Sequence, residues 1–266
     1  MNQKDIQIGT HGEQYESWMS KPVFYMFGGI AGVLAVINIL SFAKWHSKPL
    51  EIISSVGLAG TFAALGWMAW VRKQYAFGGG GMMDKVHQVI LGKLDFNGKG
   101  NVLEVGCGSG PLSVRCAKTW PNANVTGIDY WGAVWDYNKE LCDRNATLEG
   151  VGNRCQFYHG NAKKLEYGDE SFDALVSNYV YHNIVGADMQ ELLLESLRVL
   201  KKGGAFLIHD NMSRKIYGDM DAFVTKLKEM GYEKVELIDT TKEIFGSKQK
   251  AKMLMLGDSK LLYGIK

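Results

Sequence analysis

Two long stretches without a charged side chain lie in the N-terminal third of the sequence. They cover residues 23–43 and 52–71. An α-helix needs about twenty apolar residues to cross the hydrocarbon core of a bilayer, and both stretches have that length. A pair of helices buried in a soluble core is one alternative. A signal peptide cleaved near Ala43 is another, but a second apolar stretch follows it too closely. The pattern favours two membrane spans.

The two stretches are joined by a short connection, Lys44 to Glu51, and should form a helical hairpin. A hairpin returns the chain to its starting side, and the basic residues that flank it slightly favour the cytoplasm for both ends. Small residues would let the helices approach closely. These are Gly28, Gly32, Gly57, Gly60 and Ala64. We expect an integral protein of the cell membrane with its larger part in the cytoplasm, and a hairpin that could also support homo-oligomers.

Beyond residue 83, short apolar runs alternate with amphipathic segments. The expected strands cover residues 101–105, 124–129, 154–159, 170–178, 205–210, 234–238 and 260–265. The expected helices cover residues 83–94, 189–201 and 219–230, another begins at Pro111, and Gly203 with Gly204 should end the helix over residues 189–201. This alternation predicts an α/β fold, with a mostly parallel sheet and helices on both faces. The chain then divides into an N-terminal segment (1–21), the hairpin (22–73) and a domain (74–266).

The composition narrows the classes of partner. The net charge is only +2, so nothing indicates a nucleic-acid partner. The four cysteines contain no C-x-x-C pair and no spacing typical of zinc ligands. We therefore expect reduced thiols, no metal site and no nucleic acid.

A glycine-rich turn follows the first predicted strand. It reads Glu104-Val-Gly-Cys-Gly-Ser-Gly110, and Pro111 then suits the first position of a helix because proline has no N–H. Glycines at these positions let a ligand approach the backbone. A dinucleotide site would have its third glycine at position 111, and the charge of Glu104 would disfavour a pyrophosphate but suit a cation. An ordinary tight turn without a ligand is the alternative.

This turn resembles motif I of the class I S-adenosylmethionine-dependent methyltransferases. A second strand ends in Asp129, where an acid that binds the ribose hydroxyls is expected in this family. The resemblance covers roughly residues 75–266 and is strongest between Glu104 and Asp210. It is most similar to small-molecule enzymes such as the ubiquinone and menaquinone C-methyltransferases. It implies a Rossmann-like class I methyltransferase fold with a seven-stranded sheet, and S-adenosylmethionine as the cofactor.

The resemblance also implies a set of cofactor-binding residues. They are Glu104, Gly106, Cys107, Gly108, Gly110, Asp129, Tyr130, Asn161, Ala162 and Asn178. Tyr130 and its neighbour Trp131 would pack on the adenine. Asn161 departs from the family, which often has Asp there, but its carbonyl can still accept one hydrogen bond.

Polar residues after the fourth predicted strand are the catalytic candidates. The family places substrate-facing groups there, so we expect His182 to act as general base and Tyr179 or Tyr181 to shape the acceptor pocket. A structural role for His182 is the alternative. His209 and Asp210 form a second candidate pair at the end of the fifth strand.

We expect a membrane-anchored methyltransferase with a small, hydrophobic or lipid-like acceptor, because the hairpin would hold the enzyme at the bilayer. The alternatives are an enzyme for a soluble metabolite that the anchor only localises, a non-catalytic S-adenosylmethionine-binding scaffold, and a nicotinamide-dependent oxidoreductase. A glycine run, Gly78 to Gly81, precedes the domain. It is either a tether or a hinge that lets Tyr75 and Phe77 close over the cofactor.

Overall fold

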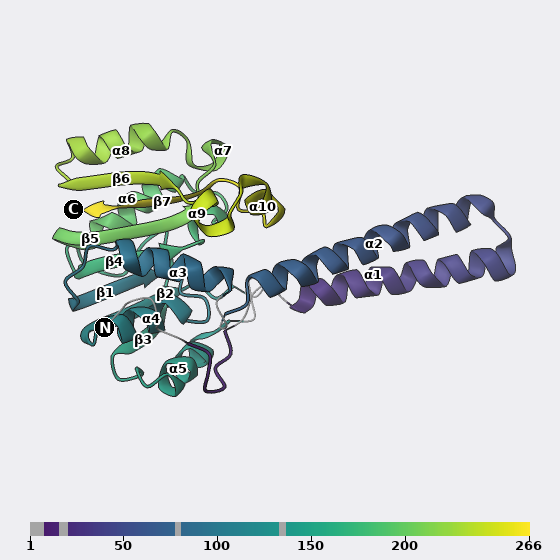
Figure 1. Ribbon diagram of the computed structural model, residues 1–266, viewed down its shortest axis with the longest axis horizontal. Helices are drawn as coiled ribbons and strands as arrows, with labels where there is room; N and C mark the ends of the chain where they lie inside the picture. The colour runs from purple at the N-terminus through teal and green to yellow at the C-terminus, as the bar shows by residue number, and fades with distance from the viewer. Residues whose placement is uncertain (1–7, 16–20, 78–80, 133–136) are drawn as a thin grey trace. The chain divides into compact units, whose positions relative to one another are not determined.

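The computed structural model describes residues 8–15, 21–77, 81–132 and 137–266. The described residues divide into two compact units (Figure 1). One is a helical pair within residues 21–76, and the other is a sheet domain formed by residues 8–15, 77, 81–131 and 137–266. Each unit is built from a different pattern of apolar residues.

The helical pair consists of two long antiparallel helices. The first, α1, covers Lys21–Leu40 and continues as a π-helical turn, η2, over Ser41–Trp45. The second, α2, covers Lys48–Gln74. The connection is therefore shorter than the expected Lys44 to Glu51. The helical backbone continues past the end of the uncharged run, through Lys44 to Trp45. A proline is well suited to the first turn of α2 because its missing N–H would have no helical partner there.

The two helices are joined by a polar side chain and one close glycine contact. Asn38 Nδ2 donates hydrogen bonds to Ser54 Oγ at 2.9 Å and to Ser55 Oγ at 2.8 Å. A Cβ on Gly57 would lie 3.2 Å from Cδ1 of Leu34, so glycine allows this approach. The same test finds open space at Gly28, Gly32 and Gly60. Gly57 therefore allows the close helix approach that the sequence predicts, whereas the other three glycines do not lie at a close contact.

Both helices are long and apolar enough to cross a membrane, judged by length and composition. Large apolar side chains along them are exposed. Examples are Tyr25, Val33, Ile39, Ile53, Val56 and Phe62, which are between 62% and 75% exposed. A helix of a soluble core would bury such side chains. The pattern suits a lipid environment.

The sheet domain contains a seven-stranded sheet with the order β3-β2-β1-β4-β5-β7-β6. Its strands are β1 (Lys99–Val105), β2 (Asn122–Asp129), β3 (Cys155–His159), β4 (Phe172–Asn178), β5 (Leu200–Asn211), β6 (Lys234–Asp239) and β7 (Ser259–Ile265). All neighbouring strands from β3 to β5 pair in parallel, and β7 is antiparallel to both β5 and β6. This confirms the expected mostly parallel sheet.

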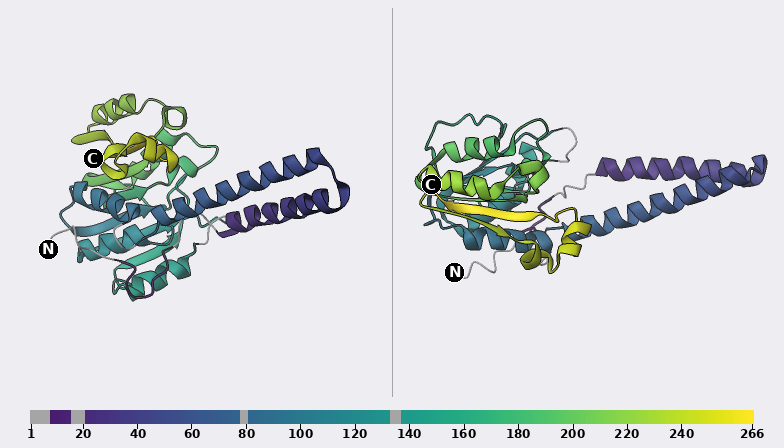
Figure 2. Two further views of the ribbon diagram at one scale, coloured as in Figure 1. Left: turned by 45° about the vertical axis from the view of Figure 1, so that its right-hand side comes forward. Right: turned by 90° about the horizontal axis from the view of Figure 1, so that it is seen from above.

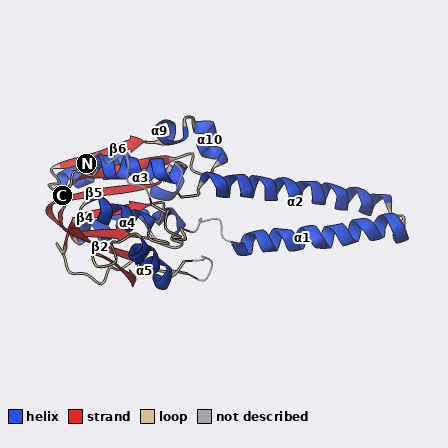
Figure 3. Cartoon of the chain, turned by 60° about the horizontal axis from the view of Figure 1, so that its bottom comes forward, coloured by secondary structure: helices blue, strands red, loops and turns tan. Residues whose placement is uncertain are grey.

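Helices cover both faces of this sheet (Figures 2 and 3). They are α3 (Met82–Lys93), α4 (Pro111–Thr119), α5 (Lys139–Leu148), α6 (Met189–Arg198), α7 (Arg214–Tyr217), α8 (Met220–Glu229), α9 (Thr241–Phe245) and α10 (Lys248–Met253), with a 3₁₀ turn, η3, at Tyr181–Asn183. Strands β2 and β3 follow β1 toward one edge of the sheet, and β4 and β5 lie on the other side of β1. Right-handed crossovers then place α4 and α5 on one face and α6 on the other.

The expected helix over residues 189–201 ends earlier than the sequence predicts. Helix α6 stops at Arg198, and Gly203 and Gly204 belong to β5 instead of ending the helix. Gly203 has a φ of 73° and donates its N–H to the Lys266 carbonyl oxygen at 2.6 Å. The pairing of β4 with β5 shifts register in this region. The glycines therefore serve an irregular strand start, where a positive φ is needed.

The segment 8–15, which we call the N-terminal strap, packs on the sheet domain. Gln14 N donates to Asn145 Oδ1 at 3.0 Å, and Asn145 Nδ2 donates to the Gln14 carbonyl at 2.9 Å. Gly9 N donates to Glu149 Oε1 at 2.7 Å. The Tyr15 ring lies 5.7 Å from that of Phe77. These contacts join the strap to the domain, whereas the sequence pattern had suggested a separate N-terminal segment.

Candidate functional site

The glycine-rich turn connects the end of β1 to the start of α4 at the carboxyl edge of the sheet. Gly106, Gly108 and Gly110 have φ values of 77°, 57° and 86°. A Cβ on Gly106 would lie 2.1 Å from Cγ2 of Val180. Gly106 N also donates to the Ile128 carbonyl at 2.8 Å, which ties the turn to β2. Glycine is therefore required here by the fold itself, whether or not a ligand binds.

Asp129, at the end of β2, holds this turn in place. Its Oδ2 accepts the N–H of Gly108 and its Oδ1 accepts the N–H of Trp131, both at 2.8 Å. Trp131 Nε1 in turn donates to the Gly108 carbonyl at 2.9 Å. Burial raises the pKa of Asp129, and the two N–H groups oppose that rise. A carboxylate can accept about four hydrogen bonds, so Asp129 keeps capacity for ribose hydroxyls.

Glu104 lies below the turn and does not present its charge to a ligand. Its side chain is buried and accepts a short hydrogen bond from Ser113 Oγ on α4. Burial raises the pKa of Glu104 to about 8, which hydrogen bonding to Ser113 only partly opposes. The carboxyl group is therefore mostly neutral at pH 7. This changes the electrostatic argument made from the sequence, because the group supports the turn and supplies little negative charge to a cofactor.

The remaining cofactor candidates lie around the same edge. Tyr130 is 64% exposed and its ring lies 5.2 Å from that of His159. Asn161 Oδ1 accepts the N–H of Lys163 at 2.9 Å within a turn, so its carbonyl is already partly used. Ala162 packs against the main apolar core. The expected residues thus surround one edge, but Asn161 stabilises its own loop.

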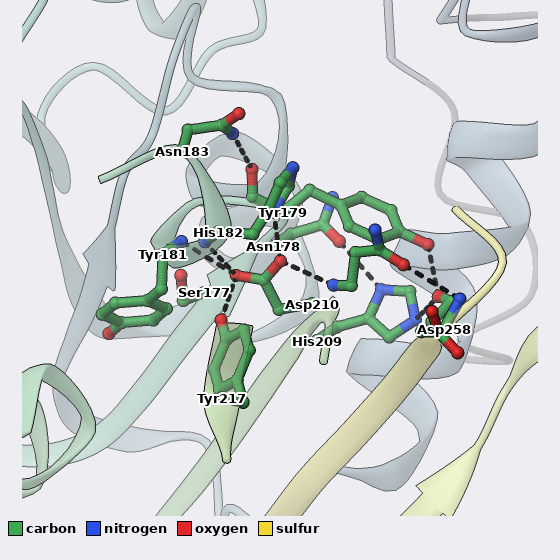
Figure 4. A network of polar contacts seen from close by, with 12 residues as sticks. Ser177, Asn178, Tyr179, Tyr181, His182, Asn183, His209, Asp210, Tyr217 and Asp258 are labelled. Atoms are coloured by element: carbon green, nitrogen blue, oxygen red, sulfur yellow. Dashed lines mark hydrogen bonds and ion pairs between the residues drawn. The ribbon is translucent and has the colours of Figure 1, made fainter. Parts of the chain in front are cut away.

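The structure brings His182 and Asp210 together, as Figure 4 shows. His182 lies on η3 after β4, and Asp210 lies near the end of β5. Nδ1 of His182 forms a short hydrogen bond with Oδ1 of Asp210. The His182 side chain is 20% exposed, whereas that of Asp210 is fully buried. Because a carboxylate only accepts hydrogen bonds, we assign the ring hydrogen to Nδ1, which leaves Nε2 as the basic nitrogen.

Asp210 is held by several further donors. Its Oδ2 accepts the N–H of Tyr181 at 2.8 Å and the hydroxyl of Tyr217 at 2.8 Å, and its Oδ1 accepts the N–H of Asn211 at 2.6 Å. Burial alone would raise the pKa of Asp210, but the contact with His182 and the bonds from Tyr217 and Asn211 hold that pKa below its ordinary value. Asp210 is therefore ionised and oriented toward the imidazole ring.

His209 and Asp210 do not pair with each other, contrary to the second candidate pair from the sequence. Neighbouring side chains of a strand point to opposite faces. Nδ1 of His209 lies 3.0 Å from Asn178 Oδ1, and its Nε2 lies 2.9 Å from Thr240 Oγ1 and 3.1 Å from Ser259 Oγ. Burial lowers the pKa of His209 to about 4. His209 is a neutral, fully bonded residue that fixes Asn178.

The two tyrosine candidates have different surroundings. Tyr181 is fully buried in the apolar core, and its hydroxyl lies 2.7 Å from Ser196 Oγ. This differs from the expectation that Tyr181 shapes an acceptor pocket. Tyr179 is half-buried, and its ring lies 6.4 Å from that of His182. Tyr179 also has a φ of 57°, and its hydroxyl lies 2.6 Å from Ser259 Oγ. Of the two, Tyr179 is the one beside the histidine.

The expected hinge lies mostly outside the described residues, which exclude 78–80. Phe77, on its N-terminal side, lies 5.5 Å from His87, ring to ring. His87 is buried, and its Nδ1 has no hydrogen-bond partner among the residues that the structure describes. Burial lowers the pKa of His87 well below its ordinary value. The ring is thus a neutral part of the aromatic contact between α3 and Phe77.

Comparison with known proteins identifies a methyltransferase segment in the middle of the chain. Residues 103–208 match a family model described as a methyltransferase domain. A demethylmenaquinone methyltransferase of Listeria welshimeri is 32% identical over 124 residues, which are 46% of this chain and 50% of that protein. A sterol 24-C-methyltransferase of Aspergillus fumigatus is 31% identical over 116 residues, which are 44% of this chain and 29% of that protein. The chain thus spans half or less of these relatives.

Solved structures share the fold at low sequence identity. A geranyl diphosphate C-methyltransferase of Streptomyces coelicolor has a TM-score of 0.55 and 12% sequence identity. The match covers 69% of this chain and 79% of that protein's chain. The [4+2]-cyclase SpnF has a TM-score of 0.54 and 18% sequence identity, and the match covers 68% of this chain and 80% of the cyclase chain. The sheet domain therefore has the Rossmann-like class I methyltransferase fold. Because a cyclase shares this fold, the fold by itself does not specify the reaction.

Proposed function

We propose that this protein is a membrane-anchored methyltransferase that uses S-adenosylmethionine to methylate a small hydrophobic or lipid-like acceptor. The observation that carries the proposal is the pairing of His182 with the buried, ionised Asp210. This pair lies at the carboxyl edge of a parallel sheet, which is where open α/β folds bind their ligands. The matched methyltransferase segment supports the class of reaction.

The residues at the glycine turn fit the cofactor. Asp129 can accept hydrogen bonds from the ribose hydroxyls, and Gly108 lets a ligand approach the backbone beside it, since a Cβ there would meet only the Tyr137 ring at 3.8 Å. The exposed Tyr130 offers an aromatic face for a base. When bound, S-adenosylmethionine supplies an electrophilic methyl group with a neutral leaving group.

His182 would act as the general base. A proton on the acceptor atom moves to Nε2 of His182 while that atom forms a bond to the methyl carbon. Bound S-adenosylmethionine would supply this methyl group, with neutral S-adenosylhomocysteine as the leaving group. Asp210 stabilises the imidazolium that results and keeps the ring in the productive tautomer. General base catalysis of this kind contributes about 10²–10⁴-fold to a rate.

The helical pair supports an acceptor that resides in a membrane. Apolar side chains are exposed along both helices of the pair. In the sheet domain, the chain leaves toward the helical pair after Tyr15 and returns at Phe77, and the rings of these two residues are in contact. Phe77 precedes α3, which leads into β1 through a short connection and so runs antiparallel to it. Its N-terminus therefore lies at the edge that carries the site. The chain from the helical pair therefore enters the sheet domain at the edge that carries the site.

The test is transfer of label from labelled S-adenosylmethionine by the purified full chain. Membrane lipid and cytosolic metabolites serve as acceptors in parallel, with His182→Ala and the control His46→Ala, an exposed histidine outside the sheet domain. We expect label in lipid-soluble products, lost with His182→Ala and kept with His46→Ala. Label only in water-soluble products would contradict the acceptor class. Cofactor binding without any transfer would favour the scaffold alternative.

A further inference from the structure

Helix α10 and the turn after it carry a run of exposed basic and apolar side chains. Lys248, Lys250 and Lys252 are all exposed. Met253 and Met255 follow them and are 56% and 57% exposed. We call these five residues the α10 patch. Methionine is more often buried than exposed in folded proteins, and here two exposed methionines follow three exposed lysines.

The charge of the α10 patch is uncompensated. No acidic residue occurs between Glu243 and Asp258 in the sequence. Within the described part of the chain, the ion pairs do not include Lys248, Lys250 or Lys252. The whole chain has a net charge of only +2, so this basic character is local.

The α10 patch lies at the edge of the sheet that carries the site. Strand β6 is parallel to β5, because both are antiparallel to β7. The segment that joins β6 to β7, which contains α10, therefore starts at the carboxyl edge of β5. Asn211, which follows Asp210, donates from Nδ2 to the Met255 carbonyl at 3.3 Å and accepts the N–H of Asp258 at 3.0 Å. The turn that follows α10 is thus hydrogen-bonded to the residue after Asp210.

We propose that the α10 patch is a docking surface for an anionic lipid bilayer. This inference rests on the proposed membrane anchoring and goes beyond it, because it assigns the face of the sheet domain that meets the lipid. Lysines attract anionic headgroups, and methionine side chains can insert at the boundary between headgroups and acyl chains. Docking by this surface would hold the site at the bilayer from which its acceptor comes.

Helix α8 offers a matched control within the same domain. Lys226 and Lys228 are exposed there, and Met230 follows them with 55% exposure. The exposure of these lysines and of the methionine is therefore similar to that in the α10 patch, whereas Glu229 between them adds a negative charge that the α10 patch lacks. However, α8 crosses from β5 to β6 along a face of the sheet, whereas α10 belongs to the connection at the site edge.

The test uses the full chain in lipid nanodiscs, either of phosphatidylcholine alone or with added phosphatidylglycerol. Met253→Cys and, separately, Met230→Cys carry a polarity-sensitive fluorophore, and the native cysteines are buried. We expect the emission at position 253 to shift to shorter wavelength only with phosphatidylglycerol, and position 230 not to shift. A lysine near an anionic surface strengthens binding about fivefold. Lys250→Glu with Lys252→Glu should therefore abolish the shift, as should high salt, whereas Lys226→Glu with Lys228→Glu should not.

Two outcomes would overturn the docking surface alone. One is an equal emission at position 253 in neutral and anionic nanodiscs, and the other is the same shift at position 230. Incorporation of the chain, scored by co-elution with the nanodiscs, tests the anchoring separately. A chain that does not incorporate would contradict both the anchoring and the docking surface.

Discussion

Asp210 is the residue on which the proposed chemistry depends most directly. Asp210→Asn keeps the shape of the side chain but removes the charge that stabilises a protonated His182. We expect turnover to fall by about 100-fold or more while cofactor affinity is retained, because Asp210 does not contact the glycine turn. The measurement is kcat together with a cofactor binding isotherm, and a thermal unfolding curve checks folding.

Tyr217→Phe is the matched control for that substitution. It removes one hydrogen bond to Asp210 and leaves the contact between Asp210 and His182 in place. Stability should fall by about 1 kcal/mol, and kcat should change far less than in Asp210→Asn. Equal losses of kcat in the two variants would mean that Asp210 supports the core and not the imidazole ring.

Glu104 should make stability depend on pH. Its pKa is raised from an ordinary 4.5 to about 8, so the folded chain binds more protons than the unfolded chain between these values. Stability therefore falls as pH rises from about 5 to 8, by roughly 2–4 kcal/mol from this group. Glu104→Gln removes this loss, so its Tm should exceed that of the parent at pH 8 and approach it near pH 5. A Tm difference that is the same at both pH values would contradict the raised pKa of Glu104. Glu140→Gln, at an exposed position, is the control variant.

At the scale of elements, the N-terminal strap is connected to the cofactor turn through one side chain. Asn145 Nδ2 donates to the Gln14 carbonyl at 2.9 Å and to the Ser109 carbonyl at 3.0 Å. Asn145→Ala removes these bonds, so we expect faster hydrogen exchange in residues 8–15 and weaker cofactor binding. Asn145→Asp keeps only the acceptor and should be intermediate. Thr147→Ala, an exposed position on the same helix, should change neither quantity.

The elements could be predicted from sequence more fully than the site. Strands such as β1 and β2 are short apolar runs with local turn signals, and Pro111 marks the start of α4. The pairing of His182 with Asp210 joins residues 28 apart in sequence, and no local pattern encodes it. One signal was available: both residues follow or end neighbouring strands of a parallel sheet. Gly203 misled the prediction because a positive φ serves a helix end and an irregular strand equally well.

At the scale of the whole molecule, the proposed membrane spans make a topological prediction. A hairpin places the N-terminus and the sheet domain on one side and the connection at His46 and Ser47 on the other. A cysteine introduced at Ser47 should react with an impermeant maleimide only from the side opposite the domain. The chain should also stay with membranes in alkaline carbonate. Release by carbonate would leave the two apolar helices as a feature of a peripheral protein.

The contact between Tyr15 and Phe77 has a consequence for how this chain can be divided. Because the strap completes the sheet domain, the helical pair is an insertion between two parts of one folding unit, and not an appendage at its start. A truncation that begins near residue 74 would discard the strap together with the helices. Excising residues 16–76 and joining the two ends through a short flexible link would keep the unit whole, since the rings of Tyr15 and Phe77 are already 5.7 Å apart.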